Sequence, residues 1–216
     1  MIQILGQLED VETLDLLAQL LKEGQSVGVP TDTSYALVAS ALSTQGVGTL
    51  LAALNLDHST ALTVLLHDRR LLPAYATASD RVKKFSAENW PGQFTLVLRR
   101  DQHLRLPFDA DGATISLRVP GNPALRKLIA RVGPITATSV AVGGERATDH
   151  LSALRLLSNS AVRALAQGAD TPITRSTILD ATQDEWRLLR RGSFPWPDGD
   201  VAGVTGAGED LDPDAS

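Results

Sequence analysis

The sequence predicts an α/β (α+β) fold: a single domain over residues 1–197, in which a mixed, twisted β-sheet is flanked by helices. Helical and β-prone segments interleave along the chain without the strict rhythm of a parallel βαβ fold, and no internal repeat is visible. With 216 residues, 43% of them hydrophobic, the chain can bury a substantial core. These observations favour one mixed domain and leave no room for an additional module of any size.

The first half of the chain predicts alternating helices and strands. Apolar residues from Val11 to Leu21 recur at helical spacing, with Asp10 as the N-cap and Gly24 as the C-terminal stop. A polar turn at 31–34 separates two β-prone runs. In chain order, the predicted elements are a helix over 10–24, strands over 26–30 and 35–42, a helix over 47–54, a strand over 61–66 and a helix over 79–89.

The second half begins where Trp90-Pro91-Gly92 ends the last of these helices. Its clearest helix has Asn122 as N-cap, Pro123 at the first helical position and Gly133 as the stop. The predicted elements are strands over 94–98 and 114–119 separated by a turn at 109–112, a helix over 122–133, a strand over 135–138, a helix over 152–166, and strands over 176–180 and 186–190.

The acidic charge of the chain is concentrated at its C-terminal end. The formal net charge is −5, but residues 198–216 hold six acids and no base, so residues 1–197 carry +1. This Gly/Asp-rich segment has no aromatic residue, and we predict a flexible tail. Basic residues elsewhere occur in short runs, which are typical of solvated helix faces; a basic cleft is the alternative interpretation.

Several kinds of site are excluded by residues that the sequence lacks. The absence of cysteine removes disulfides, thiol nucleophiles and cysteine-based metal sites. No P-loop motif occurs, and the four histidines show no metal-binding spacing, so we predict no metal site. No apolar run reaches the ~20 residues of a membrane span, and the N-terminus shows no leader, so we expect a cytoplasmic protein without a membrane partner.

Six polar or strand-end segments, in chain order, resemble the motifs of one family. They are VPTDTSY at 29–35, WPGQFTLVL at 90–98, SLRVP at 116–120, TS at 138–139, STILD at 176–180 and LRRG at 189–192. These segments resemble PTDTVYGL, WPGPLTLVL, VRxP, TSAN, STIVD and LRPG of the YrdC family, and the likeness extends over roughly residues 10–194. The resemblance implies a YrdC-like domain with a concave ligand-binding surface.

The resemblance also implies a chemistry. The best-known members of the family make threonylcarbamoyl-AMP from threonine, bicarbonate and ATP for tRNA modification. ATP with Mg²⁺ would then be a substrate, and no tightly bound cofactor is implied. Family members are also associated with double-stranded RNA, so the expected partners are a small molecule or nucleotide and, as a further alternative, RNA. The oligomeric state is left open.

Candidate substrate-binding residues lie at the strand junction 29–35 and beyond it. Thr31, Thr33 and Tyr35 offer hydroxyls that can bond a small polar substrate such as an amino acid. Arg118 can clamp a carboxylate with two hydrogen bonds, and the resemblance associates it with the carboxylate of threonine. Ser139, at a strand end, is the fifth candidate. A threonine or serine at such a position is, in isolation, equally well explained as a turn or cap.

Candidate nucleotide-binding residues lie near the C-terminal end of the domain. Ser176 opens a predicted strand and can bond phosphate oxygens, and Arg190 can neutralise their charge.

The sequence departs from the family where cations are expected. A family stretch of the form K-G-R-P-x-x-K-P-L supplies contacts to the phosphates of ATP, but alignment places Leu54, Leu56 and Thr60 at its three cationic positions. In the TSAN segment and the Ser-Gly that follows, Ala141 stands at the Asn and Gly143 at the second Ser. Adenylyl transfer relies on stabilising negative charge, so these changes remove a principal catalytic device.

Two main hypotheses follow. In the first, the protein is a divergent YrdC-like paralogue that keeps a pocket for a nucleotide or double-stranded RNA, with impaired catalysis. In the second, it is an active nucleotidyltransferase, an L-threonylcarbamoyladenylate synthase. A third possibility is a scaffold that makes its contacts through the acidic tail.

Overall fold

A computed structural model describes residues 2–108, 112–169, 171–172 and 174–196. The predicted tail 198–216, and most of the predicted turn 109–112, lie outside these residues. The elements of the first half are β1 (Gln3–Gln7), α1 (Val11–Lys22), β2 (Val27–Pro30), β3 (Tyr35–Ser40), α2 (Thr44–Ala53), β4 (Thr63–Leu65), the 3₁₀ helix η1 (Arg69–Ala74), β5 (Ala76–Thr77) and α3 (Asp80–Asn89). Those of the second half are β6 (Phe94–Arg100), β7 (Thr114–Arg118), α4 (Pro123–Val132), β8 (Ile135–Ser139), β9 (Ala141–Val142), β10 (Glu145–Arg146), α5 (His150–Leu157), β11 (Ala164–Gln167), β12 (Thr177–Asp180) and β13 (Arg187–Arg190).

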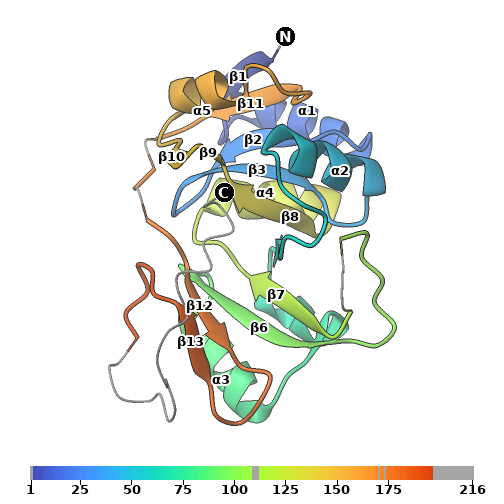
Figure 1. The fold of residues 1–216 in the computed structure, drawn as a ribbon, viewed down its shortest axis with the longest axis vertical. Helices are drawn as coiled ribbons and strands as arrows, with labels where there is room; N and C mark the ends of the chain where they lie inside the picture. Colours follow the sequence, from blue (N-terminus) through green and yellow to red (C-terminus); the bar gives the residue numbers. More distant parts are fainter. Residues whose placement is uncertain (1, 109–111, 170, 173, 197–216) are drawn as a thin grey trace.

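One mixed sheet runs through the whole described chain (Figure 1). Its strand order is β1-β11-β2-β3-β8-β4-β7-β6-β12-β13, with β5 paired to β6, while β9 and β10 form a separate hairpin. The pairs β1–β11, β11–β2, β4–β7 and β6–β12 are parallel, and the other pairs of the sheet are antiparallel. The mixed, helix-flanked sheet confirms the fold class predicted from the sequence.

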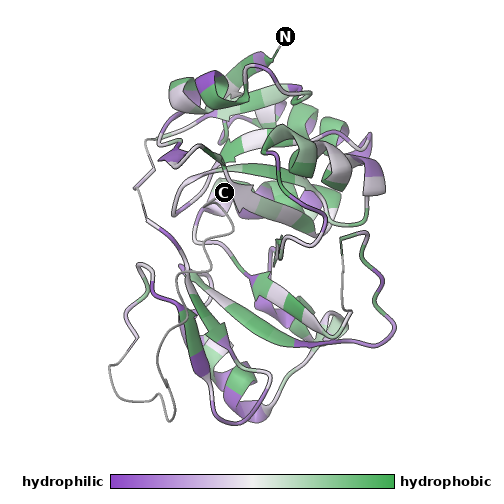
Figure 2. Cartoon of the chain, viewed as in Figure 1, coloured by the Kyte–Doolittle hydropathy of each residue, from purple (hydrophilic) through white to green (hydrophobic). Residues whose placement is uncertain are grey.

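The two faces of the sheet are covered by different helices because successive side chains of a strand point to opposite faces. In β3, Ala36 and Val38 pack in one buried cluster with apolar residues of α1 and α4. Leu37 and Ala39 pack in the other cluster, with residues of α2 and α5. Hydrophobic residues are prominent along the strands of the sheet and in parts of the helices beside it (Figure 2). Within the described residues, no helix is long and apolar enough to cross a membrane.

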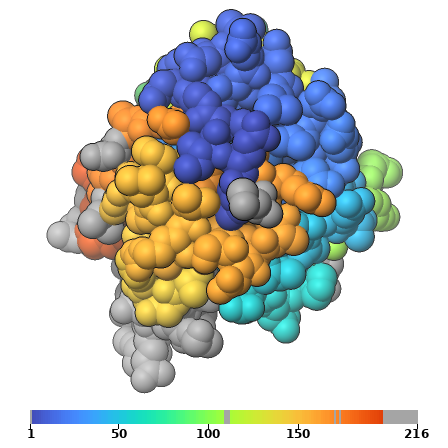
Figure 3. Space-filling model, turned by 90° about the horizontal axis from the view of Figure 1, so that it is seen from above, coloured from blue at the N-terminus to red at the C-terminus, as the bar shows by residue number. Residues whose placement is uncertain are grey.

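The helix predicted over 152–166 is wrong in its second half. Helix α5 ends at Leu157, and Ala164–Gln167 form the strand β11 between β1 and β2. Residues 164–166 are buried, and a short apolar run buried on both faces does not show whether it belongs to a helix or a strand. Seen from above, the N-terminal segment lies beside the segment that contains β11 (Figure 3). β1, which the sequence analysis did not predict, is held there by pairing with β11.

An aromatic cluster closes the far end of the sheet. The ring of Phe85 on α3 makes edge contacts with Phe94, Trp186, Phe194 and Trp196, with centroid distances of 5.1 to 5.9 Å. Edge-to-face contacts at these distances are a favourable aromatic geometry. These contacts therefore pack the segment after β13, through Phe194 and Trp196, against α3 and stabilise the position of the β12–β13 pair.

Candidate ligand-binding cavity

A cavity of about 330 Å³ lies on one face of the sheet. Helices α1 and α4 cover another part of the same face. Alternate residues of neighbouring strands form the floor of the cavity, including Thr63 and Leu65 of β4 and Ser116 of β7. Ten of its 21 described lining residues carry a hydroxyl, three are arginines, and none of them is acidic. The volume lies within the usual range for small-molecule sites, and the lining is suited to a ligand with anionic oxygen atoms.

The turn at 31–34 forms one wall of the cavity, and Thr31 holds its shape. The Thr31 hydroxyl accepts hydrogen bonds from the backbone N–H groups of Thr33 and Ser34, both at 3.1 Å, and donates to the Ser34 carbonyl at 2.7 Å. These local bonds are the turn chemistry that threonine favours. The hydroxyl of Thr31 therefore stabilises the turn, while that of Thr33 is directed toward Arg118.

Arg118 is a buried cation with several internal partners. Its Nη1 donates to Thr33 Oγ1 and its Nε to the Gly92 carbonyl, both at 3.1 Å. Its Nη2 lies 2.8 Å from Asp32 Oδ1 as an ion pair, although the two atoms are not aligned as a hydrogen bond. Burial lowers the pKa of the guanidinium, and the Asp32 carboxylate opposes that shift. The pair fixes Arg118 at the cavity wall.

Asp32 has little room to move. A Cβ at Gly121 would lie 2.7 Å from Asp32 Oδ2, so the chain after β7 packs closely against the carboxylate. Gln93 Nε2 also donates to the Asp32 carbonyl at 2.5 Å. The ion pair between Asp32 and Arg118 is therefore held between the Gly92–Gln93 segment and the chain at Gly121.

Two pairs of hydroxyl groups lie on opposite sides of the cavity, one at β8 and the other at β6 and β12. Ser139 Oγ on β8 lies 2.9 Å from Ser34 Oγ. Ser176 Oγ, directly before β12, lies 3.1 Å from Thr95 Oγ1. Arg190 donates from Nε to the Ser176 carbonyl at 3.2 Å and from Nη2 to Ser176 Oγ at 3.1 Å. The structure thus brings Ser176 and Arg190 into direct contact.

Tyr35 does not line the cavity in the described chain, unlike the other predicted binding residues. Its side chain is fully buried in the core, and its hydroxyl has no hydrogen-bond partner among the described residues. Burial, with a smaller contribution from Asp149, raises the pKa of the Tyr35 phenol above its usual range. Thr31, Thr33, Arg118, Ser139, Ser176 and Arg190 all line the cavity.

The positions where the family stretch has its cations are divided between the core and the cavity. Leu54 is 6% exposed and packs in the core at the C-cap of α2, and Leu56 packs against the same core. Asn55, between them, is the one described non-glycine residue with a positive φ, at 54°. The stretch has glycine at this position, so the left-handed backbone is retained while the cations are absent. Thr60 and the neighbouring Ala61 line the cavity.

Ala141 and Gly143 lie in the small β9–β10 hairpin. Ala141 is 9% exposed, and Gly143 has a φ of +59° in the turn, where a Cβ would meet nothing within 4 Å. Neither residue is among the described residues that line the cavity.

Several residues that line the cavity are not among the candidates predicted from the sequence. Thr95 on β6 and Ser116 on β7 line the cavity, and alternation along those strands is the signal that would have found them. Ser34 also lines the cavity, but it lies in the turn at 31–34, where no alternation applies. Arg175 also lines the cavity, but it precedes the STILD segment and no periodic pattern selects it.

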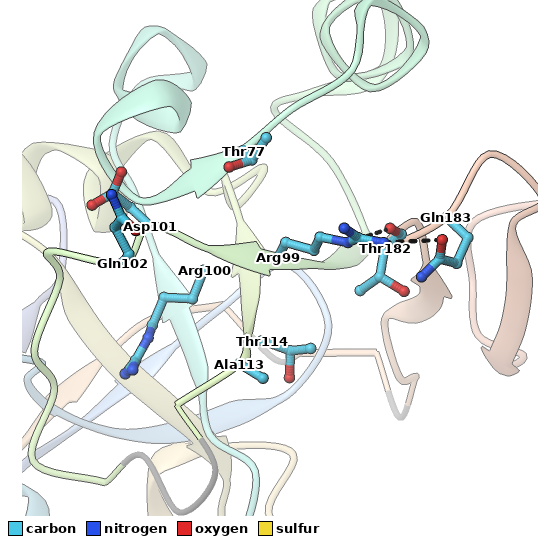
Figure 4. Close-up of a pocket in the computed structure, with 9 residues that line it drawn as sticks. All are labelled: Thr77, Arg99, Arg100, Asp101, Gln102, Ala113, Thr114, Thr182 and Gln183. Carbon is cyan, nitrogen blue, oxygen red and sulfur yellow. Dashed lines mark hydrogen bonds between the residues drawn. The ribbon is translucent and has the colours of Figure 1, made fainter.

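A second, more open hollow lies at the end of β6, away from the predicted motifs (Figure 4). There Arg99 extends toward the loop after β12, where its Nε donates to the Thr182 carbonyl and its Nη2 to Gln183 Oε1, both at 3.0 Å. Arg100, next in the strand, extends in another direction. The Arg99 guanidinium is thus used to connect β6 to the loop after β12, so the first cavity is the better candidate for a ligand site.

Comparison with known proteins identifies the family to which the sequence is similar. The sequence profile of the Sua5/YciO/YrdC family, described as "Telomere recombination", matches residues 19–192. Threonylcarbamoyl-AMP synthase of Bacillus subtilis is 29% identical over 181 residues, which cover 82% of this chain and 52% of that protein. A crystal structure of P. abyssi Sua5 in complex with L-threonine matches with a TM-score of 0.80 at 25% identity, covering 89% of this chain and 57% of that one.

A third match concerns the fold alone. The crystal structure of E. coli YciO has a TM-score of 0.80 at 22% identity and covers 89% of this chain and 96% of that one. This chain therefore spans nearly the whole of YciO but only about half of the Bacillus and Pyrococcus proteins. The profile match covers most of the sequence, and the chain belongs to the Sua5/YciO/YrdC family.

Proposed function

We propose that this protein binds a small anionic ligand of the adenylate type in the cavity, and that it has lost efficient synthesis of threonylcarbamoyl-AMP. The observation that carries the proposal is the distribution of charge in the cavity. Arginines line it at positions 118, 175 and 190, but the wall formed by Thr60 and Ala61 is neutral, and Leu54 is buried in the core.

The binding part of the proposal is supported by the lining. Hydroxyls and guanidinium groups are the donors that carboxylate and phosphate oxygens accept from. The related P. abyssi Sua5 was crystallised with L-threonine, which supports an amino acid as part of the ligand. Arg118 is already bonded to the 31–34 turn and to Asp32, so we infer that it also orders the wall against which a ligand carboxylate would bind.

The impaired-catalysis part follows from the electrostatics of the reaction. Transfer of an adenylyl group depends on cations placed against the charge that develops on the phosphates. Removal of one such donor typically costs about 10²- to 10³-fold in rate. The loss of cations at Leu54, Leu56 and Thr60 therefore predicts turnover at least about 10³-fold below that of an intact synthase.

The alternative, an active nucleotidyltransferase, requires the three arginines to replace the missing cations. Steady-state release of pyrophosphate from ATP, dependent on threonine and bicarbonate, distinguishes the two, with the Bacillus subtilis enzyme as the positive control. We expect thermal stabilisation by AMP or ATP together with pyrophosphate release near background. Release comparable to the control would establish the alternative, and no stabilisation by any nucleotide would overturn the binding proposal. Titration with duplex RNA at low salt tests the RNA expectation separately.

A further inference from the structure

The segment that enters β12 carries an arginine that none of the motifs selects. We infer that Arg175 is a phosphate-binding cation of the cavity in addition to Arg190, and that it selects ligands bearing a phosphate or pyrophosphate group over phosphate-free ones. The inference rests on the proposed function and goes beyond it, because it assigns one residue to one part of the ligand.

The backbone around Arg175 is held from both sides of the cavity. The N–H and the hydroxyl of Thr174 donate to the Thr33 carbonyl at 3.2 and 3.3 Å. The Arg175 carbonyl accepts from the N–H and hydroxyl of Ser193 at 2.9 and 3.1 Å. The backbone that carries Arg175 is therefore fixed at the lining of the cavity, and pre-organisation of this kind lowers the entropic cost of binding.

Close packing after β13 also fixes this segment. A Cβ at Gly192 would lie 2.2 Å from the Arg175 carbonyl oxygen and 2.5 Å from backbone atoms of Ser176 and Thr177. Only glycine fits there without displacing the chain. The segment at 174–176, of which Arg175 and Ser176 line the cavity, is thus packed closely against residues 192–193.

The surroundings of Arg175 suit an anion with several oxygen atoms. Ser176, the next residue, bonds Arg190 and Thr95 through its hydroxyl, so a second guanidinium and two hydroxyls gather at this edge. None of the described residues lining the cavity is acidic. Planar guanidinium groups bind phosphate with two parallel hydrogen bonds, which a single surface lysine cannot provide.

This edge is distant from the neutral wall at Thr60. In the sheet, β4 and β12 are separated by β7 and β6, which is three strand spacings or about 14 Å along the sheet. The backbone that carries Arg175 therefore lies at a different part of the cavity from the wall at Thr60 and Ala61. We expect phosphate binding to depend on Arg175 and to be insensitive to the neutral wall.

The test compares R175Q with R187Q, which removes the same charge from an exposed position on β13 that is not among the described cavity residues. Isothermal titration with inorganic pyrophosphate, AMP and L-threonine gives the affinities. We expect R175Q to weaken pyrophosphate and AMP at least tenfold and to leave threonine within twofold, R175K to be intermediate, and R187Q to match the wild type. Circular dichroism and urea unfolding verify that each variant is folded.

Two results would overturn the inference. One is equal pyrophosphate affinity for R175Q and the wild type, and the other is no measurable pyrophosphate binding by the wild type. If the wild type binds pyrophosphate through Arg175 but binds neither AMP nor ATP, the adenylate proposal fails while this inference stands. If the wild type binds AMP and R175Q binds it equally well, the inference fails and the adenylate proposal stands.

Discussion

Breaking the buried ion pair between Asp32 and Arg118 should destabilise the protein strongly. The side chains are 15% and 8% exposed, and Arg118 Nη2 lies 2.8 Å from Asp32 Oδ1. Substitution of Arg118 by Met leaves a buried carboxylate without its cation, which typically costs about 3–5 kcal/mol. For a chain of this size we expect a decrease in melting temperature of roughly 6–20 °C.

The assay is urea unfolding of D32N, R118M and the double variant, because a double-mutant cycle separates the pair from other effects of each substitution. With both charges removed, neither is left buried and uncompensated, so the double variant should lose less stability than the two single losses added. We expect a coupling free energy of about 2 kcal/mol or more. The matched control is Asp15 with Arg131, 3.2 Å apart and 64% and 34% exposed, for which we expect less than about 1 kcal/mol.

Additivity would refute this reasoning. If the losses from D32N and R118M sum to that of the double variant within about 0.5 kcal/mol, the two residues do not interact as a buried pair. A coupling no larger than that of Asp15 with Arg131 would lead to the same conclusion.

Three further predictions can be checked by unfolding experiments. The substitution L54K should lower the free energy of unfolding by at least about 2 kcal/mol, because Leu54 is buried and a lysine there must either be desolvated or disrupt the core. The substitution G192A should lower the free energy of unfolding by about 1–3 kcal/mol, because its Cβ would collide with the Arg175 carbonyl. The control G48A in α2, where a Cβ meets nothing within 4 Å, should raise it by about 0.5–1 kcal/mol. Equal effects of the two substitutions would contradict the close packing at Gly192. D149A should lose about 1 kcal/mol at neutral pH, because the Asp149 carboxylate caps α5. The backbone hydrogen bond from Ser152, the largest cause, lowers the pKa of Asp149 from 3.8, so this contribution is complete above that value and is lost as the pH falls through the folded pKa. The stability difference between D149A and the wild type should therefore shrink as the pH falls below 3.8, and a constant difference would exclude the carboxylate cap.

Elements with local signals could be predicted from the sequence. The helix expected over 122–133 is found as α4, where the Asn122 side chain accepts from the N–H groups of Ala124 and Leu125 at 2.9 and 3.0 Å. Gly133 ends the helix with a φ of +95°, a conformation that glycine adopts readily. Capping and termination depend on neighbouring residues, so they are visible in the sequence itself.

Elements defined by distant partners were not predictable in the same way. β11 is apolar and short, and only its position between β1 and β2 makes it a strand. β1 has one buried residue in five, so it lacks the periodic pattern that marks an amphipathic element. Pairing across more than 150 residues of sequence, as between Gln3 and Ala164, is a tertiary contact that no local pattern encodes.

The candidate site shows the same division. Thr33, Arg118 and Ser176 come from three strand-end motifs, and the structure brings all three to the lining of one cavity. Alternation along β3 would direct Tyr35 away from Ala36, a cavity residue on the next position of β3, and Tyr35 is indeed in the opposite cluster. The position of Arg175 depends on the bonds that join its loop to two distant segments, and the sequence contains no signal for them.

The most direct test of impaired catalysis is a single-turnover reaction with protein in excess over ATP, in the presence of threonine and bicarbonate. Mass spectrometry then measures the threonylcarbamoyl-AMP formed, independently of slow product release. We expect ATP to bind and the rate of product formation to be at least about 10³-fold below that of the Bacillus subtilis enzyme under the same conditions. A rate within tenfold of that enzyme would show that the arginines of the cavity are sufficient for the reaction and would contradict the proposed loss of synthesis.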